Sequence, residues 1–173
     1  MHQKHTISKT KGCEVSDLLF LDTEWATDAM RELVSLALVN ADGTKRFYAE
    51  RDPLPEVAST FVRTTVYPLL SRGDDAYPDR EFTQRLREFV ASGDNPRIHF
   101  DAMLDKVQLN HALAQFGYDR QGIPPYVPVF VSDALVLDEL ERYFQTHPEA
   151  LVRRHHAMVD AEALRCAYMK VLD

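Results

Sequence analysis

Apolar and polar residues follow one another along the chain in blocks that predict three strands first and mostly helices afterwards. Two apolar runs, at 17–22 and 32–39, have the length of buried strands. A turn-forming stretch at 40–44 and a weakly alternating segment at 45–50 come next. The second and third strands are therefore expected to form a β-hairpin beside the first.

Beyond residue 60 the apolar spacing becomes helical, with one further strand predicted at 96–100. Ser132 is expected to cap a helix, whereas the proline-rich stretch 121–128 is expected to be irregular. Helices are predicted over about 61–69, 79–91, 105–116, 133–144 and 157–171. This order of elements predicts an α/β fold with a mixed central β-sheet flanked by α-helices.

Composition is typical of one ordinary globular domain. The chain has 173 residues, of which 45% are hydrophobic and 27% charged, and this length suffices for a sizeable core. No apolar run approaches the roughly 18 residues that a membrane-spanning helix needs. Residues 1–11 are polar and basic, unlike a secretory signal, so we expect a short lead-in over 1–15 and a single domain over 16–173, in the cytoplasm. Cys13 and Cys166 are expected to be reduced thiols there.

The formal net charge of −7 does not favour a nucleic-acid partner by itself. Two divalent cations held by clustered carboxylates would add four positive charges and take −7 to −3. They would also reverse the local electric field. The arrangement of the acidic residues is therefore more informative than their number.

The first acidic feature is the triplet Asp22, Thr23 and Glu24 at the end of the first predicted strand. Side chains two apart on a strand point to the same face, so the two carboxylates are expected to converge. Close carboxylates repel one another unless a cation lies between them. Such a triplet alone is usually solvent-exposed, but the apolar run before it is not typical of an exposed loop.

Two further acidic features open helices. Asp105 follows the strand at 96–100, and a lone acid at a helix start is more often a cap than a ligand. His155 and Asp160 lie five residues apart, which is more than one helical turn, so His155 is expected in the loop before the last helix. Alone, this pair is more typical of a surface histidine and a first-turn acid.

Together and in this order, the three features resemble the motifs of the DEDDh exonucleases of the RNase H-like superfamily. The triplet 22–24 is similar to their first motif, 101–105 to their second, and 155–161 fits their third in full. A closer likeness is to the small bacterial polyadenylate-specific 3'→5' exoribonucleases of mycobacterial type. This likeness extends over 18–172 and includes an aromatic residue directly after the first motif, at Trp25, and the stretches 32–36, 47–49 and 61–66.

Two alternative alignments of the motifs need a choice. Asp105 is preferred to Asp101 as the acid of the second motif, because the residues after Asp105 lead directly into a helix. Asp101 then occupies the position of an asparagine in the family and becomes a supporting group. His155 is preferred to His156 because only His155 has the family's spacing to Asp160.

The resemblance implies an RNase H-like fold and a 3'→5' exoribonuclease that removes 5'-mononucleotides from single-stranded RNA 3' ends by two-metal-ion hydrolysis. It implies two Mg²⁺ or Mn²⁺ ions per site. Asp22, Glu24 and Asp160 would hold one ion, while Asp22 and Asp105 would hold the second. His155 would be the general base.

Substrate contacts are expected at the same end of the sheet. Trp25 is expected to stack on the terminal base, Thr23 to contact the ribose through its backbone, and Asp101 to support the site. Candidate phosphate contacts are Arg63, Arg97, Arg153 and Arg154. A homodimer is a candidate assembly, and membrane association is not expected. Two alternatives stay open: an exonuclease acting on single-stranded DNA ends or short oligonucleotides, and a nucleic-acid-binding member of the fold without catalysis, which the five filled motif positions disfavour.

Overall fold

The computed structural model describes residues 18–27 and 32–172. Its centre is a six-stranded sheet with the strand order β4-β3-β2-β1-β5-β6. The strands are β1 (Leu18–Trp25), β2 (Leu33–Asn40), β3 (Arg46–Arg51), β4 (Ala76–Tyr77), β5 (Arg97–Phe100) and β6 (Val127–Phe130). β1, β2 and β3 are antiparallel neighbours, whereas β4, β5 and β6 pair in parallel with their neighbours. The predicted α/β class with a mixed sheet flanked by helices is confirmed, and this arrangement is consistent with an RNase H-like fold.

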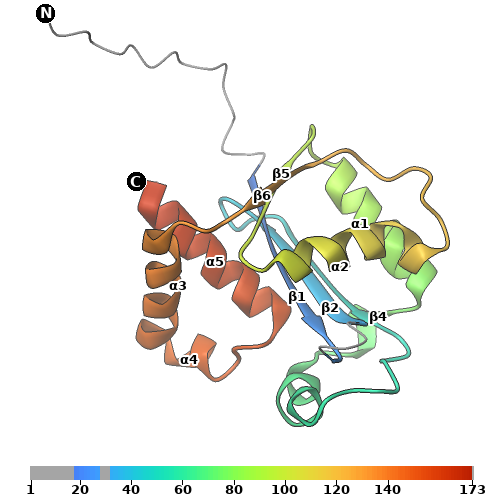
Figure 1. Cartoon of the computed structure of the whole chain (residues 1–173), viewed down its shortest axis with the longest axis horizontal. Coiled ribbons are helices and arrows are strands. Elements are labelled where there is room, and N and C mark those ends of the chain that lie inside the picture. The colour runs from blue at the N-terminus through green and yellow to red at the C-terminus, as the bar shows by residue number, and fades with distance from the viewer. Residues whose placement is uncertain (1–17, 28–31, 173) are drawn as a thin grey trace, which may run out of the picture.

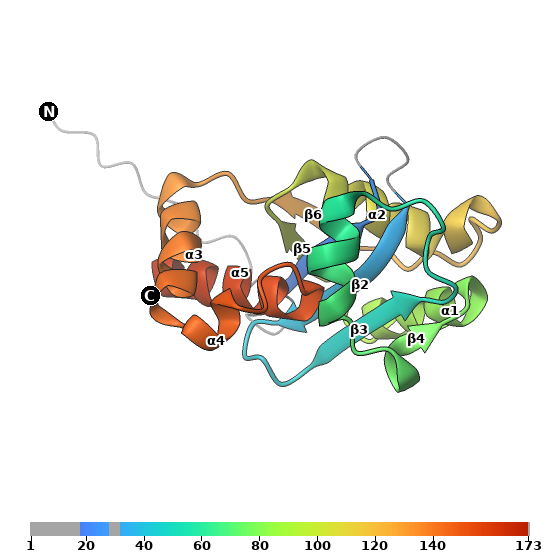
Figure 2. The ribbon, with the colours of Figure 1, turned by 90° about the horizontal axis from the view of Figure 1, so that it is seen from below.

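Five α-helices surround this sheet in the described part of the chain. They are α1 (Asp79–Ala91), α2 (Met103–Leu113), α3 (Ala134–Thr146), α4 (Pro148–Leu151) and α5 (Ala157–Leu172). Figures 1 and 2 show α3 and α4 beside α5 at one end of the molecule, with α1 and α2 at the other. Among the described helices, none combines the length and the apolar content needed to cross a membrane.

Alternation along β1 sends its side chains into two separate cores. Leu19 and Leu21 pack with residues of α1 and α2, whereas Leu18 and Phe20 pack with residues of α5. Because successive side chains of a strand point to opposite faces, the last part of β1 serves both sides of the sheet. Asp22 and Glu24 lie on the same face of β1 as Leu18 and Phe20, which is the face toward α5. Thr23 lies on the opposite face, toward α2.

Small side chains let α5 lie close to the sheet. The face that packs on the sheet consists largely of alanines, namely Ala157, Ala161 and Ala167, together with Leu164. α5 contacts both β1 and β2 along this face. Its first turn carries Asp160, and the close packing brings this acid to the end of β1.

Two sequence predictions for the second half of the chain are wrong. The end of the proline-rich stretch is not irregular, because Val127–Phe130 forms β6. Pro128 cannot donate a backbone hydrogen bond, and it is tolerated because β6 is an edge strand of the sheet. Ser132 is not the cap of α3. The cap is Asp133, whose carboxylate accepts a hydrogen bond of 2.9 Å from the backbone N–H of Leu135.

The helix predicted over 61–69 is also different in kind. The structure has a π-helical turn, Val62–Val66, followed by a 3₁₀ turn, Tyr67–Leu69. Further 3₁₀ turns lie at Gly73–Asp75 and Gln115–Gly117. Cys166 has a free thiol, whereas Cys13 and the expected lead-in over 1–15 lie outside the described residues.

Candidate active site

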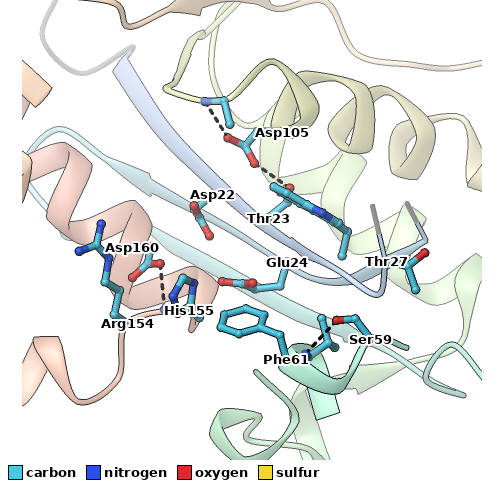
Figure 3. A pocket seen from close by; sticks show the side chains of 13 residues that line it. Asp22, Thr23, Glu24, Thr27, Ser59, Phe61, Asp105, Arg154, His155 and Asp160 are labelled. Atoms are coloured by element: carbon cyan, nitrogen blue, oxygen red, sulfur yellow. Dashed lines mark hydrogen bonds between the residues drawn. The ribbon is translucent and has the colours of Figure 1, made fainter. Parts of the chain in front are cut away.

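The end of β1 and the beginnings of α2 and α5 surround one cavity of about 500 Å³. Figure 3 shows acidic side chains from all three segments around it. Most of the residues predicted to form a site line this cavity: Asp22, Thr23, Glu24, Trp25, Asp105, His155 and Asp160. The three sequence motifs, which are far apart in the chain, are therefore adjacent in space.

The acidic residues form two groups that could each hold a metal ion. Potential ligand atoms lie within 4.8 Å of one another in the group of Glu24, His155 and Asp160, and also in the group of Asp22, Asp101 and Asp105. The grouping differs from the arrangement that the resemblance implied, because Asp101 joins Asp22 and Asp105 as a potential ligand. Asp160 is grouped with an imidazole nitrogen and Glu24, and not with Asp22.

Burial strongly disfavours full ionisation of this cluster. Burial is the largest cause that raises the pKa of Glu24 to about 8 and the pKa of Asp105 and of Asp160 to about 7. It also raises the pKa of Asp22 well above its ordinary value, and the nearby charges of Asp160 and Asp105 raise it further. Nearby positive charge would reverse these shifts.

Another buried carboxylate of the protein shows how hydrogen bonds can compensate for the loss of hydration on burial. Glu50 is fully buried, and its carboxylate accepts hydrogen bonds from the Tyr48 hydroxyl, the backbone N–H groups of Ser71 and Arg72, and the Arg72 guanidinium. In the cluster, by contrast, Oδ2 of Asp22 and Oδ1 of Asp160 are buried without a hydrogen-bond partner. Oxygen donors in this state fit a hard divalent cation.

Asp105 is fixed by the two elements that it joins. Its Oδ1 accepts a hydrogen bond of 2.8 Å from the Thr23 hydroxyl of β1, and its Oδ2 accepts one of 3.2 Å from the backbone N–H of Ala102. The second bond joins Asp105, the third residue of α2, to the backbone N–H of the N-cap residue Ala102, as in one half of a capping box. Asp105 thus lies inside the first turn of α2 and not at its N-cap, and it supports the helix start while it also contributes to the acidic cluster.

Asp160 and His155 are joined through the backbone. The N–H of His155 donates a hydrogen bond of 3.0 Å to Oδ2 of Asp160, across the first turn of α5. His155 lies before the helix, as predicted, and has a φ of +74°, which is uncommon for a residue other than glycine. The turn that carries His155 thus places it on the cavity, and the backbone hydrogen bond to Asp160 spans the five-residue spacing of the third motif.

The structure also distinguishes the two neighbouring histidines. His155 lines the cavity, and its ring meets that of Phe61 edge-on, with the centroids 5.0 Å apart. Burial and then the charge of Arg154 lower the pKa of His155, so its neutral form predominates at neutral pH. His156 is instead buried and stacks on Tyr48.

The remaining wall of the cavity is largely uncharged. Trp25 lies at a β-bulge, where its partner on β2 is Leu33 although Glu24 pairs with Ser35. A bulge changes the direction of the next side chain, which places Trp25 on the cavity. Other residues of this wall were not predicted as site residues: Thr27, Ser59, Phe61, Val62 and Ala102.

Phe61 opens the segment that was predicted as a regular helix, and half of its side chain is exposed. Phe61 is the N-cap residue of the π-helical turn, whose buried residues are Val62 and Val66. No signal in the sequence distinguishes this turn from an α-helical one. Phe61 could therefore not have been assigned to the cavity from its spacing.

Four predicted contacts do not line the cavity, namely Asp101, Arg63, Arg97 and Arg153, and the three arginines among them are exposed. Asp101 is half-buried and lies beside Asp22 and Asp105, but it is not part of the lining. Arg63 is exposed on the π-helical turn and is not part of the lining. Its prediction as a substrate contact therefore has no support from the geometry.

No family model and no curated protein matches this chain. Membership of the DEDDh exonucleases therefore stays a prediction that rests on the three motifs.

Proposed function

We propose that this protein is a metal-dependent 3'→5' exonuclease that removes 5'-mononucleotides from single-stranded RNA. The observation that carries the proposal is the meeting of five side chains from three separate segments in one cavity, namely Asp22, Glu24, Asp105, His155 and Asp160. Two of their buried carboxylate oxygens have no hydrogen-bond partner. A structural role alone would not account for so many uncompensated acids in one place.

The donor set favours Mg²⁺ or Mn²⁺ over zinc, because carboxylate oxygens dominate it and no cysteine contributes to it. Asp22 and Asp105 would hold one ion, and Glu24 and Asp160 the other. When bound, such ions supply the positive charge that phosphodiester hydrolysis needs at the attacking and leaving oxygens.

His155 is the group best suited to take a proton from the attacking water. Its imidazole lies at the cavity beside Glu24 and Asp160, and its lowered pKa keeps a ring nitrogen available to accept a proton at neutral pH. The backbone bond to Asp160 fixes the position of the loop that carries it.

The uncharged wall suits a nucleotide at the end of a chain. A cavity of about 500 Å³ lies within the size range of small-ligand sites. Trp25 provides an aromatic surface on which any base can stack. RNA as the polymer is taken from the closer sequence likeness, and the cytoplasmic location and the homodimer also stay predictions.

The proposal is tested with end-labelled single-stranded RNA and DNA of the same sequence, each with a free or a phosphorylated 3' end. Shortening of RNA by one nucleotide at a time, in Mg²⁺ or Mn²⁺, is the expected result. Equal or faster shortening of DNA would assign the enzyme to the alternative substrate. Retention of RNA without cleavage, independent of the cation, would indicate a binding module.

A further inference from the structure

Arg154 is the one arginine or lysine among the described residues that line the cavity. Figure 3 shows it beside Asp160 and His155, on the side of the cavity opposite Thr27 and Ser59. Arg63, which the sequence also offered as a phosphate contact, is exposed and does not line the cavity. The structure thus selects one arginine out of several candidates.

The guanidinium of Arg154 is held from α3. Its two terminal nitrogens donate to the two carboxylate oxygens of Glu141, over 3.0 Å and 2.6 Å. Its Cζ lies 4.7 Å from the ring centroid of Phe144, which is buried. An arginine fixed in this way on both an ion pair and an aromatic face loses less conformational freedom when a ligand binds than a mobile one does.

Donor groups of Arg154 remain after these contacts. A guanidinium carries five N–H groups in a planar fork, and the two hydrogen bonds to Glu141 use two of them. The planar fork is matched to the oxygens of a phosphate group. The side chain is about one-third exposed, at 36%, so a ligand in the cavity can reach it.

The charge of Arg154 acts on the acidic cluster. Burial raises the pKa of Asp160 and of Asp101, and the guanidinium opposes both rises. Apart from Arg154 and the imidazole of His155, the ionisable side chains that line the cavity are carboxylates, which repel a polyanion. A fixed cation at this point would lower the electrostatic cost of bringing a phosphate to the cavity.

We propose that Arg154 binds a phosphate of the nucleic-acid chain and that Glu141 and Phe144 are its positioning residues. This inference rests on the proposed exonuclease function and adds a sequence-independent contact to it. The ligand is a phosphodiester of a single-stranded oligonucleotide, without regard to the base.

The test compares Arg154→Met with Arg142→Met. Arg142 lies on α3, is exposed and pairs with Glu139, so its replacement removes the same charge and a comparable ion pair away from the cavity. Cleavage of a single-stranded RNA in Mn²⁺ is measured as kcat and KM between 50 and 300 mM salt, salt concentrations chosen to span about the range in which phosphate contacts weaken.

We expect Arg154→Met to raise KM about 10- to 100-fold with little change in kcat, and to reduce the slope of log(1/KM) against log[salt] by about 0.7, the value for one phosphate contact on a single strand. Arg142→Met should match the wild type in both quantities. Glu141→Gln should raise KM less than Arg154→Met, with the salt slope kept. Arg154→Lys should keep the slope and bind more weakly, because a point charge replaces the fork.

An unchanged KM and salt slope in Arg154→Met would overturn the inference and leave the exonuclease function intact, as would a loss confined to kcat. An unchanged KM in Glu141→Gln would overturn the positioning role. If Arg154→Met does not fold, Arg154→Lys tests the inference alone: a raised KM supports the phosphate contact, and an unchanged KM overturns it. If the wild type cleaves nothing, the proposed function fails, and anisotropy of a labelled oligonucleotide with Ca²⁺ still tests the contact through the same salt slope.

Discussion

Replacing Asp160 by asparagine should stabilise the metal-free protein at alkaline pH. The substitution is nearly isosteric, and it keeps an oxygen that can accept the hydrogen bond from the backbone N–H of His155. The asparagine amide nitrogen would take the place of Oδ1, which is buried without a partner. The substitution therefore removes a charge from the acidic cluster and leaves the local backbone contact in place.

The size of the effect follows from the pKa of Asp160. Burial raises this pKa from its ordinary 3.8 to about 7, which corresponds to a cost of up to about 4 kcal/mol for the ionised group above pH 7. Neighbouring carboxyls can take up protons instead, so we expect a net gain of about 2 kcal/mol for the variant. For a domain of this size that is roughly 4–8 °C in Tm.

The pH dependence has a definite sign. Because the folded-state pKa of Asp160 lies above its unfolded value, the wild type loses stability as pH rises from about 4 to about 7, and the loss is complete above that. The advantage of Asp160→Asn should therefore be largest near pH 8.5 and small near pH 4. Thermal unfolding followed by circular dichroism in EDTA measures it.

Adding Mn²⁺ should reduce the difference in Tm between the wild type and Asp160→Asn, or make the wild type the more stable of the two. A cation that binds only the folded state raises Tm by mass action, and the wild type offers it one more carboxylate. The reasoning would be refuted if Asp160→Asn were less stable than the wild type at pH 8.5 in EDTA and gained as much from Mn²⁺.

Three further predictions concern single residues of the site and the core. His155→Ala should lower kcat by about 10²- to 10⁴-fold while keeping most of the Mn²⁺-induced rise in Tm; loss of that rise would make His155 a ligand and not a base. Trp25→Ala should raise KM by about 5- to 150-fold, the equivalent of about 1–3 kcal/mol for one stacked base, and an unchanged KM would exclude stacking. Leu36→Ala, in the core cluster that β2 shares with α1 and α2, should lower the free energy of unfolding by about 2–5 kcal/mol in urea titrations; a change below about 1 kcal/mol would contradict this assignment to the core.

The periodicity of apolar residues was sufficient to predict the helices and strands that bury a continuous hydrophobic face. The predicted helix at 79–91 coincides with α1, and the predicted strands at 17–22 and 32–39 correspond to β1 and β2. The short strand β6 was missed because edge strands tolerate proline and bury little apolar surface. Its pairing with β5 is a tertiary contact that has no local signature.

The site divides in the same way. Its acids lie at element boundaries, where a carboxylate next to an apolar run is visible in the sequence. The uncharged wall was not predictable, because the sequence does not distinguish the π-helical turn that follows Phe61 from an α-helical one. Arg154, on the charged side, was one of several candidate phosphate contacts, and its contacts with α3 come only from the fold. Arg63 was an equally good candidate in the sequence, and only the fold shows that Arg154 lines the cavity and Arg63 does not.

The most direct test of the central claim is a time course with 5'-labelled single-stranded RNA, resolved to single nucleotides, for the wild type and Asp22→Asn. The proposal predicts a ladder that shortens stepwise from the 3' end in Mg²⁺ or Mn²⁺, with 5'-mononucleotides as the product. EDTA and Asp22→Asn should each abolish it. Internal cleavage, or a ladder that persists in EDTA or in Asp22→Asn, would contradict the account.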